Sequence, residues 1–214
     1  MKIYDVMKTP VVTVASDLPI EEAFEIMKKK GFRHLPVVDN DGLITGIVSD
    51  KDLRQALVPV DKVRSNKRYF YFKNLIFVQD VMTVNPICIK PDMDVDEVAF
   101  LLYSKKISAL PVVENLKIVG IVTESDLLLL LIGILGLLKN GMYFILKEGE
   151  DQKALSRAIF VVTKLGGRII SITVMPQKQA DDKSYRFRVD IEERKRKELM
   201  QNLKDEGLDI TVCA

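Results

Sequence analysis

One eight-residue stretch occurs twice in this chain of 214 residues. Its first copy is GIVSDKDL at residues 46–53, and its second is GIVTESDL at residues 120–127. Each copy places an apolar, β-branched run before Ser or Thr, followed three residues later by Asp. This pattern is typical of a short buried strand that leads into a helix. Because a unit this small buries too little surface to be stable alone, the repeat predicts two copies that share a core.

The similarity between the copies extends over most of their length. Val6-Met7 recurs as Val81-Met82, and HLPVV at residues 34–38 recurs as ALPVV at residues 109–113. In the first copy we expect a strand over residues 11–15, a helix capped by Ser16 or Asp17, and a hairpin of strands 34–38 and 43–48. A second helix follows from Ser49. The unit is therefore β-α-β-β-α, and the expected domains are repeat 1 at 1–57, a linker at 58–79 and repeat 2 at 80–138.

The repeated Gly-apolar-apolar-Ser/Thr-x-x-Asp motif, preceded by Leu-Pro-Val-Val, resembles a tandem CBS-domain pair, also called a Bateman module. The resemblance implies an α/β fold in which the two repeats pack against each other. It also implies a non-catalytic regulatory protein that binds an adenosine nucleotide, such as AMP, ADP, ATP or S-adenosylmethionine, between the repeats. No further cofactor is expected.

Residues 139–214 follow a different pattern, predicted to be β-α-β-β-α-β and therefore ferredoxin-like. The segment GGRII at residues 166–170 is similar to a glycine-rich segment of the ACT-domain family, and the whole order resembles AcuB-type proteins, named for acetoin utilisation. That resemblance implies effector sensing or dimerisation. However, residues 150–155 (EDQKAL) lack the Pro and Gly of the family's effector loop. We therefore favour docking or dimerisation and keep amino-acid sensing as an alternative.

The Ser/Thr-x-x-Asp pairs have two interpretations. Ser49 with Asp52, and Thr123 with Asp126, form capping boxes that stabilise a helix start by about 1 kcal/mol. Alternatively, the carboxylate binds ribose hydroxyls while the hydroxyl and the helix N-terminus bind a phosphate, as acidic residues and helix ends do in dinucleotide folds. The two roles are compatible. The CBS resemblance implies the same assignment for these four residues.

The remaining candidate binding residues flank these motifs. Arg33 could clamp phosphates, and His34, the only histidine in the chain, could hydrogen-bond one or sense pH. The second copy has Ser108-Ala109 at the equivalent positions, so the two sites are expected to differ. Apolar strands are expected around the adenine, and the candidate set is completed by Leu35, Pro36, Ala109, Leu110, Pro111, Val12 and Cys88.

Composition limits the other classes of function. A net charge of +2 gives no general argument for nucleic-acid or membrane binding, and Cys88 and Cys213 have no metal-ligand spacing. The most apolar run, residues 127–138, covers only about 18 Å as a helix and is too short to cross a bilayer. We interpret it as a buried helix that contacts the C-terminal domain and a second subunit, which implies a homodimer. A cytoplasmic protein is expected.

Two further hypotheses stay open at this stage. Residues 62–73 interleave basic and aromatic residues, a pattern of single-stranded nucleic-acid binding, although a solvated linker is the interpretation we favour. An enzyme is disfavoured because the sequence shows no nucleophile–base pair, metal cluster or phosphate loop. A regulated protein partner is compatible with the sensor hypothesis.

Overall fold

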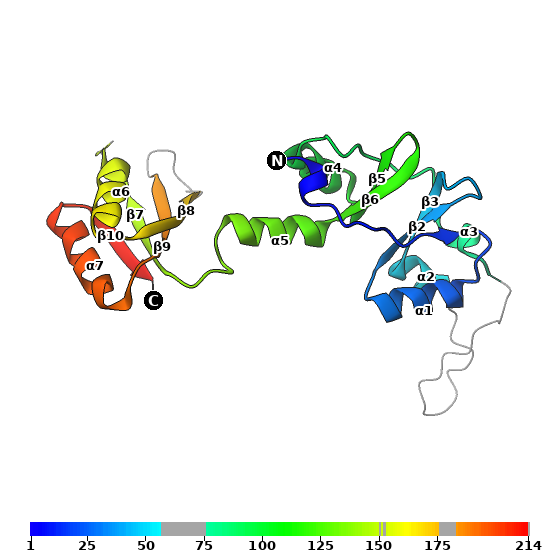
Figure 1. Ribbon diagram of the computed structural model, residues 1–214, viewed down its shortest axis with the longest axis horizontal. Coiled ribbons are helices and arrows are strands. Elements are labelled where there is room, and N and C mark those ends of the chain that lie inside the picture. The colour runs from blue at the N-terminus through cyan, green and yellow to red at the C-terminus, as the bar shows by residue number, and fades with distance from the viewer. Residues whose placement is uncertain (57–75, 150, 152, 176–182, 214) are drawn as a thin grey trace, which may run out of the picture. The chain divides into compact units, whose positions relative to one another are not determined.

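The computed structural model describes residues 1–56, 76–149, 151, 153–175 and 183–213 (Figure 1). The basic and aromatic part of the predicted linker, residues 62–73, lies outside these ranges. The chain divides into two compact units, Met1–Leu127 and Leu128–Ala214, and each is described by itself.

The first unit follows the predicted β-α-β-β-α order in its first copy, although only Val14–Ala15 of the strand expected over residues 11–15 forms. In the second copy, the strand equivalent to it is reduced to a single parallel bridge between Ile89 and Val112. The elements of this unit are η1 (Ile3–Asp5), β1 (Val14–Ala15), α1 (Ile20–Lys30), β2 (His34–Val38), β3 (Ile44–Ser49), α2 (Asp50–Ala56), α3 (Val78–Val81), β4 (Thr83–Val84), α4 (Val95–Lys105), β5 (Ala109–Glu114), β6 (Lys117–Thr123) and α5 (Glu124–Ile134), whose last residues extend into the second unit. The two hairpins, β2–β3 and β5–β6, are both antiparallel.

Helix α1 begins later than the sequence suggests. The expected N-cap at Ser16 or Asp17 is wrong, and Pro19 occupies the position before the helix. The carbonyls of Ser16 and Leu18 instead accept hydrogen bonds from the backbone of residues 78 and 79, at 2.9 Å each. This pairing keeps residues 16–18 in a turn outside the helix, which starts at Ile20.

The first residues of each repeat pack with the other repeat. Strand β4, at the start of the second copy, pairs with β3 of the first copy through Ile47 and Thr83. Lys8 forms the equivalent antiparallel bridge to Ile121 of the second copy. Two apolar side chains are exchanged between the copies in the same way. Val78 is fully buried in the hydrophobic core of the first copy, and Ile3 is fully buried in the hydrophobic core of the second copy. The domain boundaries at 57 and 80 remain predictions, but each hydrophobic core contains residues from both repeats.

The glycine that opens each repeated stretch makes this exchange possible. A Cβ at Gly46 would overlap the Met82 sulfur, and a Cβ at Gly120 would overlap the Met7 sulfur and lie 3.0 Å from Met7 Cγ. Each methionine therefore packs directly onto a bare strand backbone of the opposite copy.

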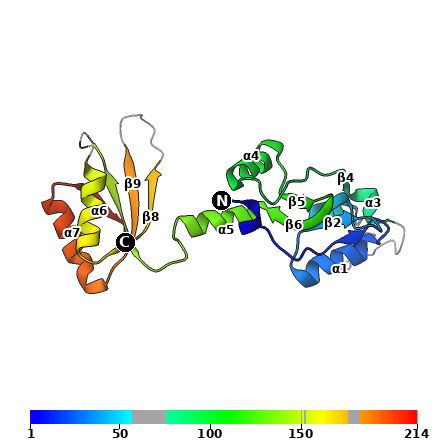
Figure 2. The same cartoon turned by 45° about the horizontal axis from the view of Figure 1, so that its top comes forward.

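The second unit has six main elements in the predicted β-α-β-β-α-β order. They are β7 (Met142–Lys147), α6 (Ala154–Lys164), β8 (Arg168–Met175), β9 (Ser184–Asp190), α7 (Arg196–Asp205), preceded by η2 (Glu193–Lys195), and β10 (Asp209–Cys213). The strands form one antiparallel sheet in the order β10-β7-β9-β8. Figure 2 shows α6 and α7 on the same face of this sheet.

The core of the second unit lies between the sheet and its two helices. Phe144 on β7 and Phe187 on β9 stack with ring centroids 4.9 Å apart, and both are fully buried. Leu199 and Leu203 of α7 cover them together with the apolar face of α6. At the end of α6, Gly166 has a φ of 77°, and a Cβ at Gly167 would lie 2.9 Å from the Val162 carbonyl oxygen. The Gly-Gly pair therefore allows β8 to turn back closely beneath the helix.

A β-bulge interrupts the regular pairing of β8 with β9. The register shifts between Ile169 and Ser171, so Ser171 pairs with Arg188 while Ile172 pairs with the buried Phe187. Ser171 Oγ then donates to the Leu135 carbonyl at 3.0 Å, and Arg188 donates to the Lys139 carbonyl at 2.9 Å. The segment after α5 is thereby attached to this sheet.

Helix α5 carries the most apolar run of the sequence, yet none of its described residues is buried. Leu128 and Ile134, for example, keep 57% and 58% of their surface exposed. Neither unit by itself therefore provides the buried environment that the sequence predicts for residues 127–138. Across the described residues, no helix is both long and apolar enough to span a membrane.

Candidate functional site

The repeated Ser/Thr-x-x-Asp motif folds in the same way in both copies. Asp52 Oδ2 accepts hydrogen bonds from the Ser49 backbone N–H at 2.9 Å and from the Ser49 hydroxyl at 2.6 Å. In the second copy, Asp126 Oδ2 accepts from the Thr123 N–H at 3.0 Å and from its hydroxyl at 2.7 Å. The return bonds, from the Asp N–H to the hydroxyl oxygen, are 3.3 Å in both copies. These are capping boxes in which Asp replaces the longer Glu.

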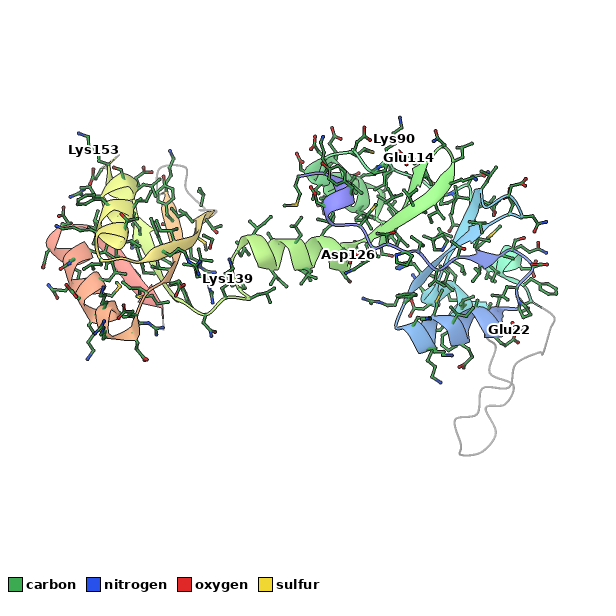
Figure 3. All side chains as sticks on the ribbon, in the orientation of Figure 1. Glu22, Lys90, Glu114, Asp126, Lys139 and Lys153 are labelled. Atoms are coloured by element: carbon green, nitrogen blue, oxygen red, sulfur yellow. The ribbon has the colours of Figure 1, made fainter. Side chains whose placement is uncertain are left out.

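Capping uses only one carboxylate oxygen of each Asp, so the other oxygen is the chemically informative one. Asp126 lies at the start of α5 (Figure 3), and its Oδ1 forms an ion pair with Lys8 Nζ at 3.6 Å. Within the described part of the chain, Asp52 Oδ1 has no such partner. The first copy thus presents a carboxylate oxygen that can accept a hydrogen bond from a ligand.

A cleft of about 330 Å³ opens beside Asp52. We call it the Asp52 cleft, and it is lined by His34, Ile47, Ser49, Asp52, Thr83, residues 85–87 and residues 106–109. The lining combines the end of the first copy's motif with the segment after β4 and with the residues between α4 and β5. The cleft is therefore formed by both repeats. Its volume is in the range of small-molecule sites.

His34 joins the two repeats at this cleft. Its Nε2 lies 2.9 Å from the Ser108 hydroxyl, a contact between equivalent ends of β2 and β5. Burial lowers the pKa of His34 below its usual value, and the positive charge of Arg33 acts in the same direction. His34 is thus held neutral near pH 7, where it can donate or accept one hydrogen bond depending on its tautomer.

Arg33 points to the other copy's motif. Its guanidinium donates to the Ser125 hydroxyl at 3.3 Å, and Ser125 lies between Thr123 and Asp126 in the chain. Ser108, which occupies the equivalent position of the second copy, lines the Asp52 cleft. We call the group of Lys8, Arg33, Thr123, Ser125 and Asp126 the Asp126 site. Each repeat therefore supplies the residue before its Leu-Pro strand to the opposite repeat's motif.

The other predicted binding residues divide into two groups. Ala109 lines the Asp52 cleft together with His34. Leu35 and Leu110 lie fully inside the two hydrophobic cores, and Pro36 and Pro111 are also buried; none of these four lines the Asp52 cleft. Their assignment to a binding site stays a prediction.

Two further predicted residues lie close to the Asp52 cleft or to the hydrophobic core of the first copy. Val12 is half-buried against the first copy's core. Cys88 follows directly after the cleft residue Ile87, and its thiol, whose pKa is raised by burial, donates to the Pro86 carbonyl at 3.4 Å.

Sequence reasoning missed Lys8, Thr83, Asn85 and Lys106. Lys8 and Thr83 both follow the repeated Val-Met dipeptide, so the repeat itself marks them. What the sequence did not indicate is that each one lies beside the motif of the other copy. Lys106 adopts a left-handed backbone, with a φ of 54°, at the end of α4 and contributes a positive charge to the Asp52 cleft.

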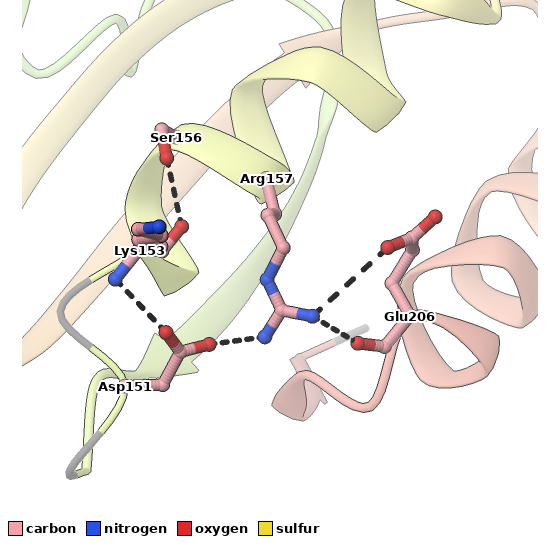
Figure 4. A network of polar contacts seen from close by, with 5 residues as sticks. All are labelled: Asp151, Lys153, Ser156, Arg157 and Glu206. Carbon is pink, nitrogen blue, oxygen red and sulfur yellow. Dashed lines mark hydrogen bonds and ion pairs between the residues drawn. The ribbon is translucent and has the colours of Figure 1, made fainter.

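The loop before α6 in the second unit is held by an ionic network (Figure 4). Arg157 pairs with Asp151 and donates to the Glu206 carbonyl at 2.6 Å, while Asp151 Oδ1 accepts from the Lys153 backbone N–H at 2.9 Å. These bonds, first that from Lys153 and then that from Arg157, lower the pKa of Asp151. The network connects Asp151 and the first turn of α6 to the residue that follows α7. Over the residues that the structure describes, no cluster of three or more metal-ligating side chains occurs.

Comparison with known proteins identifies the repeats. The family model described as "CBS domain" matches residues 3–59 and 78–133. A CBS domain-containing protein of Dictyostelium discoideum is 34% identical over 130 residues, covering 60% of this chain and 90% of that protein. A homoserine O-acetyltransferase of Methanosalsum zhilinae is 36% identical over 124 residues, covering 58% of this chain but 22% of that enzyme. The chain thus spans about a fifth of such enzymes.

Solved structures show the same similarity over the first part of the chain. A CBS domain pair in complex with 5′-methylthioadenosine and S-adenosyl-L-methionine is 32% identical, covers 61% of this chain and 95% of its own, and has a TM-score of 0.52. A putative acetoin utilization protein (AcuB) from Vibrio cholerae is 28% identical over 64% of this chain and 95% of its own, with a TM-score of 0.53. The protein CBSX2 in complex with AMP is 27% identical over 62% of this chain and 97% of its own, with a TM-score of 0.52.

Proposed function

This chain belongs to the CBS domain family, and we propose that it is a non-catalytic regulatory protein that binds an adenosine nucleotide in the Asp52 cleft. The observation that carries the proposal is the carboxylate of Asp52. One of its oxygens holds the helix start, and the other is available at a cleft of about 330 Å³. A ribose offers two neighbouring hydroxyls as donors to such an acceptor.

The surroundings of Asp52 suit the rest of an adenosine ligand. Ile47, Ile87 and Ile107 provide apolar surface for a base, and Lys106 provides a positive charge for an anionic group. Similar CBS pairs have been solved with 5′-methylthioadenosine, S-adenosyl-L-methionine and AMP. The shared element of those ligands is adenosine, which supports the same ligand class here. The titration described below determines which of AMP, ADP, ATP and S-adenosylmethionine binds.

A regulatory role is favoured over a catalytic one, although the fold does create a serine–histidine contact that the sequence does not reveal. Ser108 and His34 are 2.9 Å apart, as a nucleophile and its base would be. In the described chain, however, no hydrogen bond from a third group orients the His34 ring. The contact joins two equivalent strand ends, which makes an interface role the simpler explanation. The matched enzymes share only the CBS pair with this chain.

For the second unit we propose an ACT-like domain that docks or dimerises. The element order, the antiparallel sheet and the close Gly166-Gly167 turn support this assignment. The exposed apolar residues of α5 favour a homodimer, since a second copy would bury them. Amino-acid sensing by this domain remains the alternative proposal. The Arg157 network disfavours it, because its ion pair and hydrogen bonds already occupy the polar groups before α6. A role of residues 62–73 in nucleic-acid binding, and the cytoplasmic location, remain predictions.

Nucleotide binding to the CBS pair would regulate by differential affinity. A ligand that contacts both repeats, through Asp52 from one and Ser108 from the other, stabilises the arrangement in which the two surfaces face each other. That arrangement would then set how the second unit or a protein partner is presented.

A thermal-shift and calorimetric titration of the full chain tests the proposal. AMP, ADP, ATP and S-adenosylmethionine are each added, and at least one should raise the melting temperature in proportion to its occupancy. Asp52→Asn should remove the shift of that ligand, whereas Asp41→Asn, at an exposed turn outside the cleft lining, should preserve it. If none of the four ligands binds at millimolar concentration, the proposed function is wrong.

A further inference from the structure

The two repeated motifs differ in the group that neutralises their carboxylate. Lys8 Nζ lies 3.6 Å from Asp126 Oδ1, and the Asp126 side chain is only 11% exposed. At the equivalent position beside Asp52 the chain has Thr83, which carries no charge. A ribose can approach Asp52 directly, but it can reach Asp126 Oδ1 only after Lys8 moves away.

A second cation lies at the same motif. Arg33 donates to Ser125, one residue before Asp126, whereas the residue equivalent to Arg33 in the other copy is the neutral Ser108. The motif of the second copy therefore has two cations, Lys8 and Arg33, beside its carboxylates, Glu124 and Asp126. The Asp52 cleft has one cation, Lys106, for one carboxylate.

We infer that the two sites take adenosine ligands of different charge, and that Lys8 is the residue that separates them. The Asp52 cleft binds adenosine without requiring a phosphate chain. The Asp126 site prefers an adenosine nucleotide with a phosphate chain, such as ATP, over adenosine. This inference rests on the proposed function and adds a ligand class for each site.

The physical basis is an exchange of counter-ions. Adenosine has no negative charge, so it cannot replace Asp126 as the partner of Lys8, and the ion pair competes with its ribose. The phosphates of ATP offer Lys8 and Arg33 another set of anionic oxygens, with Arg33 suited to bidentate contact. Lys8 can then leave Asp126 Oδ1 without losing a partner, and that oxygen becomes free to accept from the ribose.

The chain contains its own matched substitutions for a test. Lys8→Thr and Arg33→Ser convert residues of the Asp126 site to those of the other copy, and Thr83→Lys makes the reverse change. Lys8 pairs with Ile121 only through backbone groups, at 2.9 and 3.1 Å, and its side chain is 65% exposed. The substitutions should therefore leave the melting temperature of the free protein nearly unchanged.

Isothermal titration calorimetry of the full chain, without divalent cations, uses adenosine and ATP as probes. Wild type should bind one equivalent of adenosine, and the adenosine-saturated protein should still bind one equivalent of ATP. In Lys8→Thr/Arg33→Ser that ATP affinity should fall about tenfold or more, since charge-assisted bonds to phosphate are lost. Lys8→Thr alone should strengthen adenosine binding at the second site about threefold to fivefold. Thr83→Lys should weaken adenosine binding in the Asp52 cleft.

The outcomes separate the two levels of the argument. If wild type binds neither adenosine nor ATP, the proposed function fails and the inference fails with it. If adenosine fills two equal sites, or if adenosine-saturated protein takes up no ATP, the inference is wrong while adenosine binding by the pair stands. Unchanged ATP affinity in the double variant, or unchanged adenosine affinity in Lys8→Thr or Thr83→Lys, also overturns the role given to Lys8.

Discussion

The exchange of segments between the repeats can be tested at a single glycine. Gly120→Ala places a methyl group against the Met7 sulfur, with Met7 Cγ only 3.0 Å away. Overpacking of this kind costs about 1–3 kcal/mol. Gly120 has no left-handed backbone, so alanine also restricts the unfolded chain and recovers about 0.4–1 kcal/mol. The difference between these ranges is about 0–2.6 kcal/mol, so we expect a net loss of about 1 kcal/mol in the free energy of unfolding.

A second substitution identifies the residue that causes the loss. Met7→Ala removes the overlapping side chain, so the double variant should be more stable than the sum of the single changes by about 1–2 kcal/mol. Met82→Ala should give no such coupling, because Met82 contacts Gly46 of the other copy. If each repeat kept its own first residues, Met82 and not Met7 would relieve the alanine at position 120.

Urea unfolding followed by far-UV circular dichroism measures these energies, with the two units fitted as separate transitions. Coupling between positions 120 and 7 within about 0.5 kcal/mol of zero, or coupling between positions 120 and 82, would refute the exchanged arrangement. The reciprocal pair, Gly46→Ala with Met82→Ala, repeats the test in the first copy.

Three further predictions follow from the described contacts. Asp52→Ala should cost about 1 kcal/mol of stability by urea unfolding, since both capping bonds are lost, and a value near zero would contradict the capping geometry. Because burial lowers the pKa of His34, the unfolded state binds a proton more readily, so stability present above pH 6.5 should decrease as the pH falls below it. Melting curves of His34→Gln should lack that decrease. If the variant and the wild type show the same dependence of melting temperature on pH, His34 is not the group responsible. Phe187→Ala should destabilise the second unit by about 3–5 kcal/mol in calorimetry, whereas Phe160→Ala, at a side chain that is 60% exposed, should change it by less than about 0.5 kcal/mol; similar effects of the two would contradict the described core.

The sequence alone predicts the local elements and the paired repeats well. The β-branched runs before Ser49 and Thr123, and the glycine that ends α1 with a φ of 71°, carry enough local information to mark strands and a helix end. The family model and the solved relatives confirm the CBS pair that the repeated motif indicates. The capping bonds of Asp52 and Asp126 follow as well, because their partners lie only three residues away.

Contacts between residues distant in the sequence were decided only by the tertiary structure. The pairing of Lys8 with Asp126, the direction of Arg33 and the meeting of His34 with Ser108 join residues that lie 74 or more positions apart. A pattern of apolar and polar residues describes which face of an element is buried, but it does not identify the partner that buries it. In this chain each segment has two nearly identical strands against which it could pack. The contacts of Met7 with Gly120 and of Met82 with Gly46 show which of the two strands each segment contacts, and these contacts are seen only in the tertiary structure.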